Sequence, residues 1–353
     1  MNYLTPVREE DQFDLARVQS WLSPIIGISE LPDLKQFRSG ASNLTYQLEY
    51  PDRTLILRRP PVGTKAVSAH DMKREFTIQA RLKPKYGLVA EMIALCEDHS
   101  ILGSDFYVMS KIEGEIFQRE VPADLSASDI SLLADSLVGG LVQLHSVDAT
   151  ILADLSKGPG YVRRQVEGWS NRYQNARTGD VPDGEDVMNW LDANQPEDVA
   201  SCVIHGDWRL DNMVFDLTAR KLVGVLDWEL ATVGDPLMDL GSALAYWVDR
   251  DDDALFASLR RQPSHLDGMP TRREFIARYL ELSGRKCDDF TFYEVFGLFR
   301  LTVIVQQIWA RYRAGQTTNP AFADFGMGVQ ILLGRAQGLL HESRTYQRFH
   351  SPL

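Results

Sequence analysis

The sequence predicts an α+β protein with two parts, a small strand-rich N-terminal part and a larger, mostly helical C-terminal part. Three observations carry this expectation. Strand signals broken by glycine and proline fill residues 1–110, whereas helical periodicity dominates residues 111–353. The length of 353 residues, 44% of them hydrophobic, is enough for a large two-part body with a full core. We place the boundary near residue 110.

The elements expected in residues 1–110 follow from the spacing of apolar residues. Phe13, Val18 and Trp21 lie on one face of a short helix. Proline at positions 60 and 61 ends the third strand, because proline cannot donate to a strand ladder. The full prediction is a helix over 11–22, strands over 34–37, 44–50 and 54–57, a helix over 68–82, and extended apolar segments over 88–95 and 105–109.

The second part is predicted to be helical, strongly so over 130–145, except for one β-hairpin. Met213–Phe215 and Leu222–Leu226 are short strand signals, and the residues between them form a polar turn. Antiparallel pairing returns the chain to its starting point, so Asn212 and Asp227 are expected to become neighbours.

The residues around this hairpin carry the chemistry. The stretch from His205 to Asn212 has an aspartate, Asp207, five residues before the asparagine, and Asp227 ends an apolar run. An amide oxygen and a carboxylate are hard ligands suited to Mg²⁺ that bridges phosphates, and Asp207 lies close enough to meet a substrate hydroxyl. Either stretch alone is also typical of an ordinary surface hairpin. Both together, in this order, favour a site built around a nucleotide triphosphate.

A phosphate clamp is predicted in the first part. Gly40, Ser42 and Asn43 form a turn between two strands whose backbone N–H groups can face an anion, although most such turns only join strands. Arg58 ends the third strand and Glu75 lies on the next helix, so the carboxylate can aim the cation at phosphates. The alternative for Arg58 is an ordinary surface arginine.

The junction of the two parts is a second candidate for nucleotide contact. The extended apolar segment from Tyr107 to Ser110 can offer backbone groups to an adenine edge. The alternative is that this segment is only a buried strand, and the two interpretations are compatible with each other.

The net charge limits the classes of molecule that this protein is expected to bind. The net charge of −12 argues against non-specific nucleic-acid binding, and the acidic excess lies in residues 111–353. That excess either attracts a cationic substrate or only keeps the protein soluble.

Cys96, Cys202 and Cys287 suit neither a disulfide framework nor a zinc site. We expect a cytoplasmic protein with a small-molecule substrate, no secretory signal and no membrane-spanning segment; the oligomeric state stays open.

These motifs resemble the aminoglycoside phosphotransferase family of kinase-like small-molecule kinases over nearly the whole chain. The resemblance rests on His205-Gly206-Asp207, Asn212, Asp227 and the stretch Gly234–Leu240. The chain is most similar to the subgroup that contains the kinase-like domain fused to acyl-CoA dehydrogenases. Supporting stretches are Leu57–Pro61, Arg164-Gln165 with Trp169 and Arg172-Tyr173, and Phe296–Arg300 with Gln306 and Arg311.

The resemblance implies a two-lobed, protein-kinase-like fold that uses ATP and Mg²⁺. Asp207 would orient and deprotonate the acceptor hydroxyl, and Asn212 and Asp227 would bind Mg²⁺. Arg58, paired with Glu75, would replace the usual lysine, which changes the geometry of its donors. Protein substrates are not expected, because His-Gly-Asp replaces His-Arg-Asp and no Ala-Pro-Glu segment follows.

The expected reaction is transfer of the γ-phosphoryl group of ATP to a hydroxyl of a small substrate, of which a hydroxyacyl compound is one candidate. Aminoglycosides, amino alcohols and sugars are alternatives, as is GTP for ATP. An alternative of another class is a nucleotide-binding module without catalysis. Other polar residues are expected to be structural: His205 orders the loop, His145 packs, Asp235 caps a helix and Asp239 buttresses the catalytic loop.

Overall fold

The computed structural model describes residues 4–38, 43–61 and 71–350, with side chains described as far as position 341. The chain divides into two compact units. Unit 1 comprises Met1–Gly114 together with Val223–Leu230, and unit 2 comprises Glu115–Leu222 together with Ala231–Leu353. The first change of unit therefore lies at Gly114, where we expected a boundary near 110. The segment Val223–Leu230, which contains Asp227, belongs to unit 1 although the sequence placed it in the helical part.

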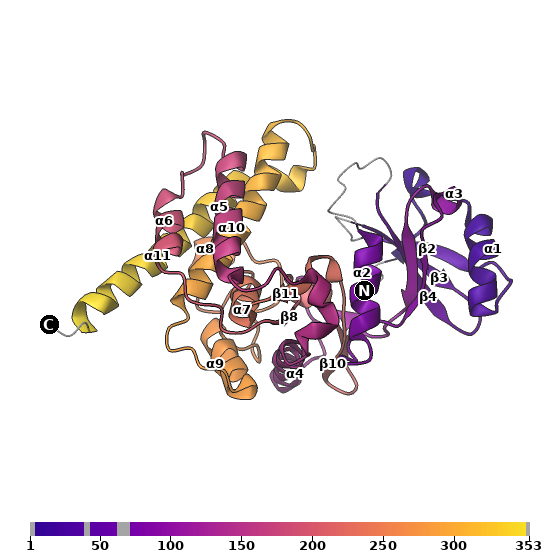
Figure 1. Cartoon of the computed structure of the whole chain (residues 1–353), viewed down its shortest axis with the longest axis horizontal. Helices are drawn as coiled ribbons and strands as arrows, with labels where there is room; N and C mark the ends of the chain where they lie inside the picture. Colours follow the sequence, from indigo (N-terminus) through magenta and orange to yellow (C-terminus); the bar gives the residue numbers. More distant parts are fainter. Residues whose placement is uncertain (1–3, 39–42, 62–70, 351–353) are drawn as a thin grey trace. The chain divides into compact units, whose positions relative to one another are not determined.

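Unit 1 is built on a six-stranded sheet with the order β1-β2-β3-β4-β6-β5, in which each neighbouring pair of strands is antiparallel. Figure 1 shows helix α1 against this sheet. The predicted strands and helices are present with shifted ends, residues 68–70 of the predicted helix 68–82 lie outside the described residues, and the short elements β1 and α3 were not predicted. The bounds are β1 (Leu4–Thr5), α1 (Leu15–Ile26), β2 (Asp33–Phe37), β3 (Leu44–Glu49), β4 (Thr54–Arg59), α2 (Met72–Leu82), β5 (Met92–Cys96), α3 (His99–Leu102) and β6 (Phe106–Ser110).

Strand β4 decides which residues face which helix. Leu55 and Leu57 pack in the cluster that includes Val18 and Leu22 of α1. Ile56 packs in the other cluster, with Met72 of α2 and with Tyr107 and Met109 of β6. Because side chains alternate along a strand, Arg58 lies on the same face as Ile56, towards α2.

Unit 2 is mostly helical, with two small sheets, one of which includes β10, whose last residues, Val223–Val225, are counted in unit 1. The three-stranded sheet has the order β10-β9-β7, and β8 pairs with β11. The predicted hairpin is thus present as the neighbouring strands β9 and β10. The bounds are β7 (Glu115–Ile116), α4 (Ala127–His145), α5 (Tyr161–Ala176), α6 (Glu185–Ala193), β8 (Cys202–Ile204), β9 (Met213–Asp216), β10 (Lys221–Val225), β11 (Thr232–Gly234), α7 (Pro236–Leu244), α8 (Ala254–Ala257), α9 (Arg272–Ser283), α10 (Thr291–Arg313) and α11 (Phe325–His350).

Short 3-10 turns complete both units. They occupy Glu9–Asp11, Ala149–Leu155, Leu210–Asn212, Trp228–Leu230 and Pro320–Phe322. The turn Leu210–Asn212 ends the stretch His205–Asn212, and the turn Trp228–Leu230 begins directly after Asp227.

Helix α10 is the central helix of unit 2 and packs on α5, α7 and α11. Its crossing with α7 brings two backbones into contact. A Cβ atom on Gly297 would collide with the carbonyl oxygen of Gly241, and one on Gly241 would collide with the carbonyl oxygen of Tyr293. Only glycine permits this approach, which holds α7, and with it Asp239, against α10.

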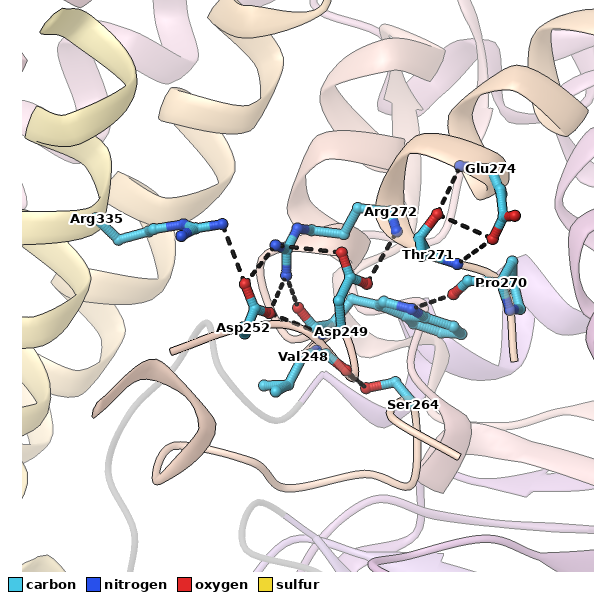
Figure 2. Close-up of polar contacts among 10 residues, drawn as sticks. Val248, Asp249, Asp252, Ser264, Pro270, Thr271, Arg272, Glu274 and Arg335 are labelled. Atoms are coloured by element: carbon cyan, nitrogen blue, oxygen red, sulfur yellow. Dashed lines mark hydrogen bonds and ion pairs between the residues drawn. The ribbon is translucent and has the colours of Figure 1, made fainter. Parts of the chain in front are cut away.

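An ionic cluster around Arg272 ties α9 to α11, as Figure 2 shows. The Arg272 guanidinium lies 2.6 Å from Asp252 and 3.3 Å from Asp249, and Arg335 of α11 reaches Asp252 at 3.1 Å. Burial pushes the pKa of Asp252 up, but the hydrogen bonds from Arg272 and from the Asp249 N–H, together with the charges of Arg272 and Arg335, hold that pKa below its usual value. A capping box between Thr271 and Glu274 starts α9 at the same place.

The expectation of no membrane-spanning segment has to be checked at one helix, α4. By length and composition its 19 residues pass that test, with a mean hydropathy of 1.2. In the structure α4 is a capped helix that packs on α9, with Leu133, Leu137 and Leu141 buried. The Arg220 side chain pairs with Asp129 in its first turn at 2.7 Å. These contacts are those of a core helix.

Candidate active site

Arg58 and Glu75 are buried in unit 1, and the half-buried Asp227 lies beside Arg58. Arg58 lies opposite Tyr107 in the pairing of β4 with β6, so its side chain projects towards α2, where Glu75 lies in the first turn. One terminal nitrogen of Arg58 lies 3.4 Å from Oε1 of Glu75 and donates to Oδ1 of Asp227 at 3.0 Å. The structure therefore brings together the cation and carboxylate that the sequence suggested, and adds Asp227 to them.

Burial dominates the electrostatics of this cluster. It raises the pKa of Glu75 even though the Arg58 charge opposes the shift. Burial alone would lower the pKa of Arg58, but Glu75 and Asp227 outweigh it and the guanidinium stays charged. Tyr107, expected only as the first residue of the extended segment that ends at Ser110, is fully buried beside both groups and accepts a hydrogen bond from Gln79 at 3.3 Å.

Asp227 stands at a strained point of the backbone. Its φ of 63° lies in the left-handed region that non-glycine residues rarely adopt. Trp228, next in the chain, is fully buried against Tyr86 and donates its indole N–H to the carbonyl of Val225 at 2.9 Å. The anchored indole holds the turn, so the Asp227 side chain, 32% exposed, is fixed beside Arg58.

Of the predicted phosphate-binding turn, Gly40 and Ser42 lie outside the described residues. Asn43 is buried, and its amide nitrogen donates to a carboxylate oxygen of Glu229 at 3.4 Å. Arg74 of α2 donates to the Glu229 carbonyl at 2.8 Å. The side chain of Asn43 thus supports the segment after Asp227, and its contact with phosphate stays a prediction.

Ser110 ends β6 and is engaged with the chain before β5. Its backbone N–H donates to the carbonyl of Glu91 at 2.8 Å, and its hydroxyl accepts from the Glu91 N–H at 2.9 Å. The N–H group is therefore occupied. A contact between the backbone of Ser110 and a nucleotide base stays a prediction.

In unit 2, the predicted catalytic loop, His205–Asn212, is held at its start by Asp239 of α7. One of its carboxylate oxygens accepts from the N–H of His205 at 2.9 Å and the other from the N–H of Gly206 at 2.8 Å. Burial opposes the charge of Asp239, but hydrogen bonds, first that of His145, hold its pKa below the usual value. The expected buttressing role of Asp239 agrees with these contacts, and Asp235 caps α7 as predicted.

Asp239, His145 and Tyr279 form a buried chain of polar groups, which the half-buried Arg285 extends. His145 bonds to Asp239 at 3.1 Å through one ring nitrogen and to the hydroxyl of Tyr279 at 2.7 Å through the other. Arg285 donates to the same hydroxyl at 3.3 Å. His145 is therefore a structural residue, as the sequence predicted, and its role is to tie α4 and α9 to the residue that holds the catalytic loop.

Asp207 and Asn212 are in direct contact. The Asn212 amide nitrogen donates to the carbonyl of Asp207 at 2.9 Å and to its carboxylate at 3.0 Å. This orientation leaves the amide oxygen as the group that faces away from Asp207. The Asp207 side chain is 20% exposed, and Arg209 lies 4.0 Å from it.

Arg209 is a residue that sequence reasoning missed. It forms a two-pronged ion pair with Asp211 and stacks on the ring of Tyr246, 4.6 Å from its centroid. These contacts place a positive charge beside the catalytic aspartate candidate. The signal was present in the stretch His205–Asn212, but the partner Tyr246 is too distant in sequence to be paired from it.

The side chains predicted to bind Mg²⁺ carry the type of oxygen atom that this ion prefers. Asp227 offers a carboxylate and Asn212 an amide oxygen, the hard oxygen ligands that Mg²⁺ prefers. Within the part of the chain that the structure describes, no group of three His, Cys, Asp or Glu side chains is arranged to hold a metal ion. Asp227 belongs to unit 1 and Asn212 to unit 2, so binding of one ion by both residues stays a prediction.

Comparison with known proteins gives a consistent family assignment. A model described as the phosphotransferase enzyme family matches residues 33–275. Mouse acyl-CoA dehydrogenase family member 10 is 34% identical over 89% of this chain, and human acyl-CoA dehydrogenase family member 11 is 33% identical over 89%. The matches cover 30% and 40% of those relatives, so the chain spans less than half of their length.

Solved structures agree in fold. A putative aminoglycoside phosphotransferase from Ralstonia eutropha is 28% identical, with a TM-score of 0.76 over 93% of this chain and 99% of that one. A macrolide 2′-phosphotransferase of type I has a TM-score of 0.63 at 18% identity, over 92% of this chain and 98% of that one. The second likeness shows the fold alone. Together these structures confirm the predicted kinase-like fold.

Proposed function

Because this chain belongs to the phosphotransferase enzyme family, we propose that it is a small-molecule kinase that transfers the γ-phosphoryl group of ATP to a hydroxyl group. The observation that carries the proposal is the geometry of the catalytic loop. Asp207 is partly exposed, contacts Asn212 at 3.0 Å, and follows two residues whose N–H groups are held by Asp239. A carboxylate held in this way can orient an acceptor hydroxyl and accept its proton.

The other site residues would bind and position the nucleotide. Asp227 and Asn212 would hold Mg²⁺, which supplies neutralisation of the phosphate charge when bound. Arg58, kept charged by Glu75, would lie against the phosphates in place of the lysine of the wider family. The turn with Gly40, Ser42 and Asn43, and the backbone of Ser110, would complete the nucleotide site.

ATP is the proposed donor because one of the similar structures is a ternary complex with the ATP analogue AMP-PNP. Another is a complex with GDP, so a direct comparison of ATP with GTP belongs in the first assay. Both neighbours are below 20% identical to this chain, so they support the proposal only through the shared fold.

We propose a hydroxyacyl-type compound as the acceptor. Support comes from the relatives that are 33–34% identical, whose names are those of acyl-CoA dehydrogenases. The competing acceptors are aminoglycosides and amino alcohols, which the structural neighbours and the acidic composition favour. The identity to the acyl-CoA dehydrogenase relatives is the higher of the two, and for that reason we rank the hydroxyacyl class first.

A transfer screen tests the proposal. Purified protein, Mg²⁺ and ATP labelled in the γ-phosphate would be incubated with hydroxyacyl-CoAs, aminoglycosides, amino alcohols and sugars. Label should appear in a hydroxyacyl compound. Label in an aminoglycoside alone would reject the acceptor class but keep the kinase. Nucleotide binding without transfer to any acceptor would instead indicate a binding module.

Asp207→Asn tests the role of the proposed base. Loss of a general base lowers turnover by roughly 10²- to 10⁴-fold, whereas nucleotide affinity should change little. Asp216→Asn is the matched control, because Asp216 is a carboxylate of the β9–β10 turn. Full activity of Asp207→Asn would refute the assignment.

The three cysteine thiols support a proposal for where in the cell the protein works. Among the described residues Cys96, Cys202 and Cys287 are all free, and the first two are buried. We propose that the protein works in the reducing cytoplasm, where such thiols persist. Fractionation of cells that express the full-length protein would test this.

A further inference from the structure

We propose that Arg300 of α10 is a positioning residue for the catalytic loop. One terminal nitrogen of its guanidinium donates to the carbonyl oxygen of Gly206 at 2.7 Å. Arg300 is only 8% exposed, so this hydrogen bond is made in a largely water-free environment. The inference rests on the proposed function, in which Asp207, the next residue, orients the acceptor hydroxyl.

Gly206 needs such support because it has no side chain to fix its own orientation. Its φ of 81° lies in the left-handed region that favours glycine. On its amino side the N–H is held by Asp239 at 2.8 Å, and on its carboxyl side the carbonyl is held by Arg300. That carbonyl belongs to the peptide bond that carries the N–H of Asp207. Arg300 therefore fixes the plane from which the Asp207 side chain departs.

The surroundings of Arg300 keep its guanidinium in place. It lies over the indole of Trp169 from α5, 5.3 Å from the ring centroid. Tyr173, one turn further along α5, packs on Phe299 at 5.8 Å. No ion pair joins Arg300 to a carboxylate within the part of the chain that the structure describes, so the Gly206 carbonyl and the indole are the contacts that orient it.

This assignment explains two stretches of the sequence that the proposed chemistry did not use. The stretch around Trp169 and the stretch that ends in Arg300 are more than 100 residues apart, and α5 and α10 bring them together. Lysine could keep the charge at position 300, but it lacks the planar group that stacks on an indole while donating to a carbonyl.

The test separates positioning from folding. Turnover and the KM for ATP would be measured for Arg300→Met, Arg300→Lys and Arg300→Ala, the last with and without added methylguanidinium. Arg313→Met is the matched control, because Arg313 lies on the same helix over the indole of Trp309 at 5.6 Å and makes no contact with the catalytic loop. Hydrogen exchange of residues 203–212 would be followed in the same variants.

We expect Arg300→Met to lower kcat by roughly 10- to 100-fold, because small displacements of a reacting group have effects of this size, with the KM for ATP nearly unchanged. Methylguanidinium should restore part of the kcat of Arg300→Ala, and exchange at 203–212 should rise in Arg300→Met but not in Arg313→Met. Unchanged kcat, or a loss without rescue that accompanies general unfolding, would overturn the proposal.

The proposed kinase function and the proposed role of Arg300 can be refuted independently of each other. If the wild-type protein transfers phosphate to no acceptor, the proposed function fails while the exchange measurement still decides the role of Arg300. Equal exchange of residues 203–212 in wild type and in Arg300→Met would then show that Arg300 does not hold the loop.

Discussion

Replacing Arg58 by methionine should destabilise unit 1 by an amount that depends on pH. Arg58 is the cation nearest to the buried carboxylate of Glu75, at 3.4 Å. Methionine keeps the apolar stem but leaves Glu75 without a countercharge. Removing one partner of a buried ion pair typically costs about 3–5 kcal/mol. Asp227 contributes less to this loss, because its side chain is 32% exposed and can be solvated.

The loss has an upper bound, because Glu75 can take up a proton instead of staying charged. Its ordinary pKa is 4.5, and burial already raises it in the wild-type protein. Keeping a carboxyl protonated costs 1.36 kcal/mol for each pH unit above that value, so the bound is about 3.4 kcal/mol at pH 7 and about 1.4 kcal/mol at pH 5.5. In the variant the folded state keeps this proton and the unfolded chain releases it. The free energy of unfolding must therefore fall as pH rises.

The assay is urea unfolding of wild type and Arg58→Met between pH 5.5 and pH 7.5. Hydrogen exchange of the β3 and β4 peptides would be followed, so that unit 1 is measured separately from unit 2. Arg58→Met combined with Glu75→Gln is the control, since a neutral amide has no proton to gain and the extra pH dependence should disappear. A destabilisation that is the same at both ends of the pH range would refute the reasoning.

The remaining predictions concern unit 2. Asp239→Asn replaces one of the two carboxylate oxygens that accept from the N–H groups of His205 and Gly206 by an NH₂ group, which would face an N–H group. We expect the free energy of unfolding to fall by about 2 kcal/mol and kcat to fall as well, as measured by urea unfolding and a turnover assay. Wild-type values of both quantities would contradict the contacts described. Arg272→Met should cost about 3 kcal/mol because it removes the partner of Asp249 and the nearer of the two partners of Asp252, while Arg273→Met should be neutral in the same urea titration. Gly297→Ala should force α7 and α10 apart and lower Tm by several degrees, which calorimetry would detect.

The strands and helices of unit 1 could be predicted because they depend on short-range periodicity. Along β4, Leu55 and Leu57 lie on one face of the sheet and Ile56 lies on the other. Because side chains alternate along a strand, Arg58 lies on the face of Ile56, towards α2. The pairing of Arg58 with Glu75 followed from the same local logic. The first residue of a helix could be predicted where a capping residue precedes an apolar run, as at Asp235 before Pro236.

The catalytic loop could be recognised from its residues but not from its supports. The spacing of Asp207 and Asn212 already indicated the chemistry, and the structure places the two in contact. Nothing in the local pattern indicated that Arg300 reaches Gly206, because that contact joins residues 94 positions apart. Side-chain contacts of this kind depend on how helices cross, which periodicity does not encode.

The sequence by itself determined the fold class, the helical or extended character of most segments and the order of the chemistry-bearing residues, since each depends on neighbours within a few positions. Only the tertiary structure decided that the segment with Asp227 belongs to unit 1, that His145 and Tyr279 stand behind Asp239, and that α5 and α10 meet beside the catalytic loop. The physical reason is that these arrangements come from packing between distant elements, where the close approach of two backbones at a glycine or a single buried guanidinium sets the geometry.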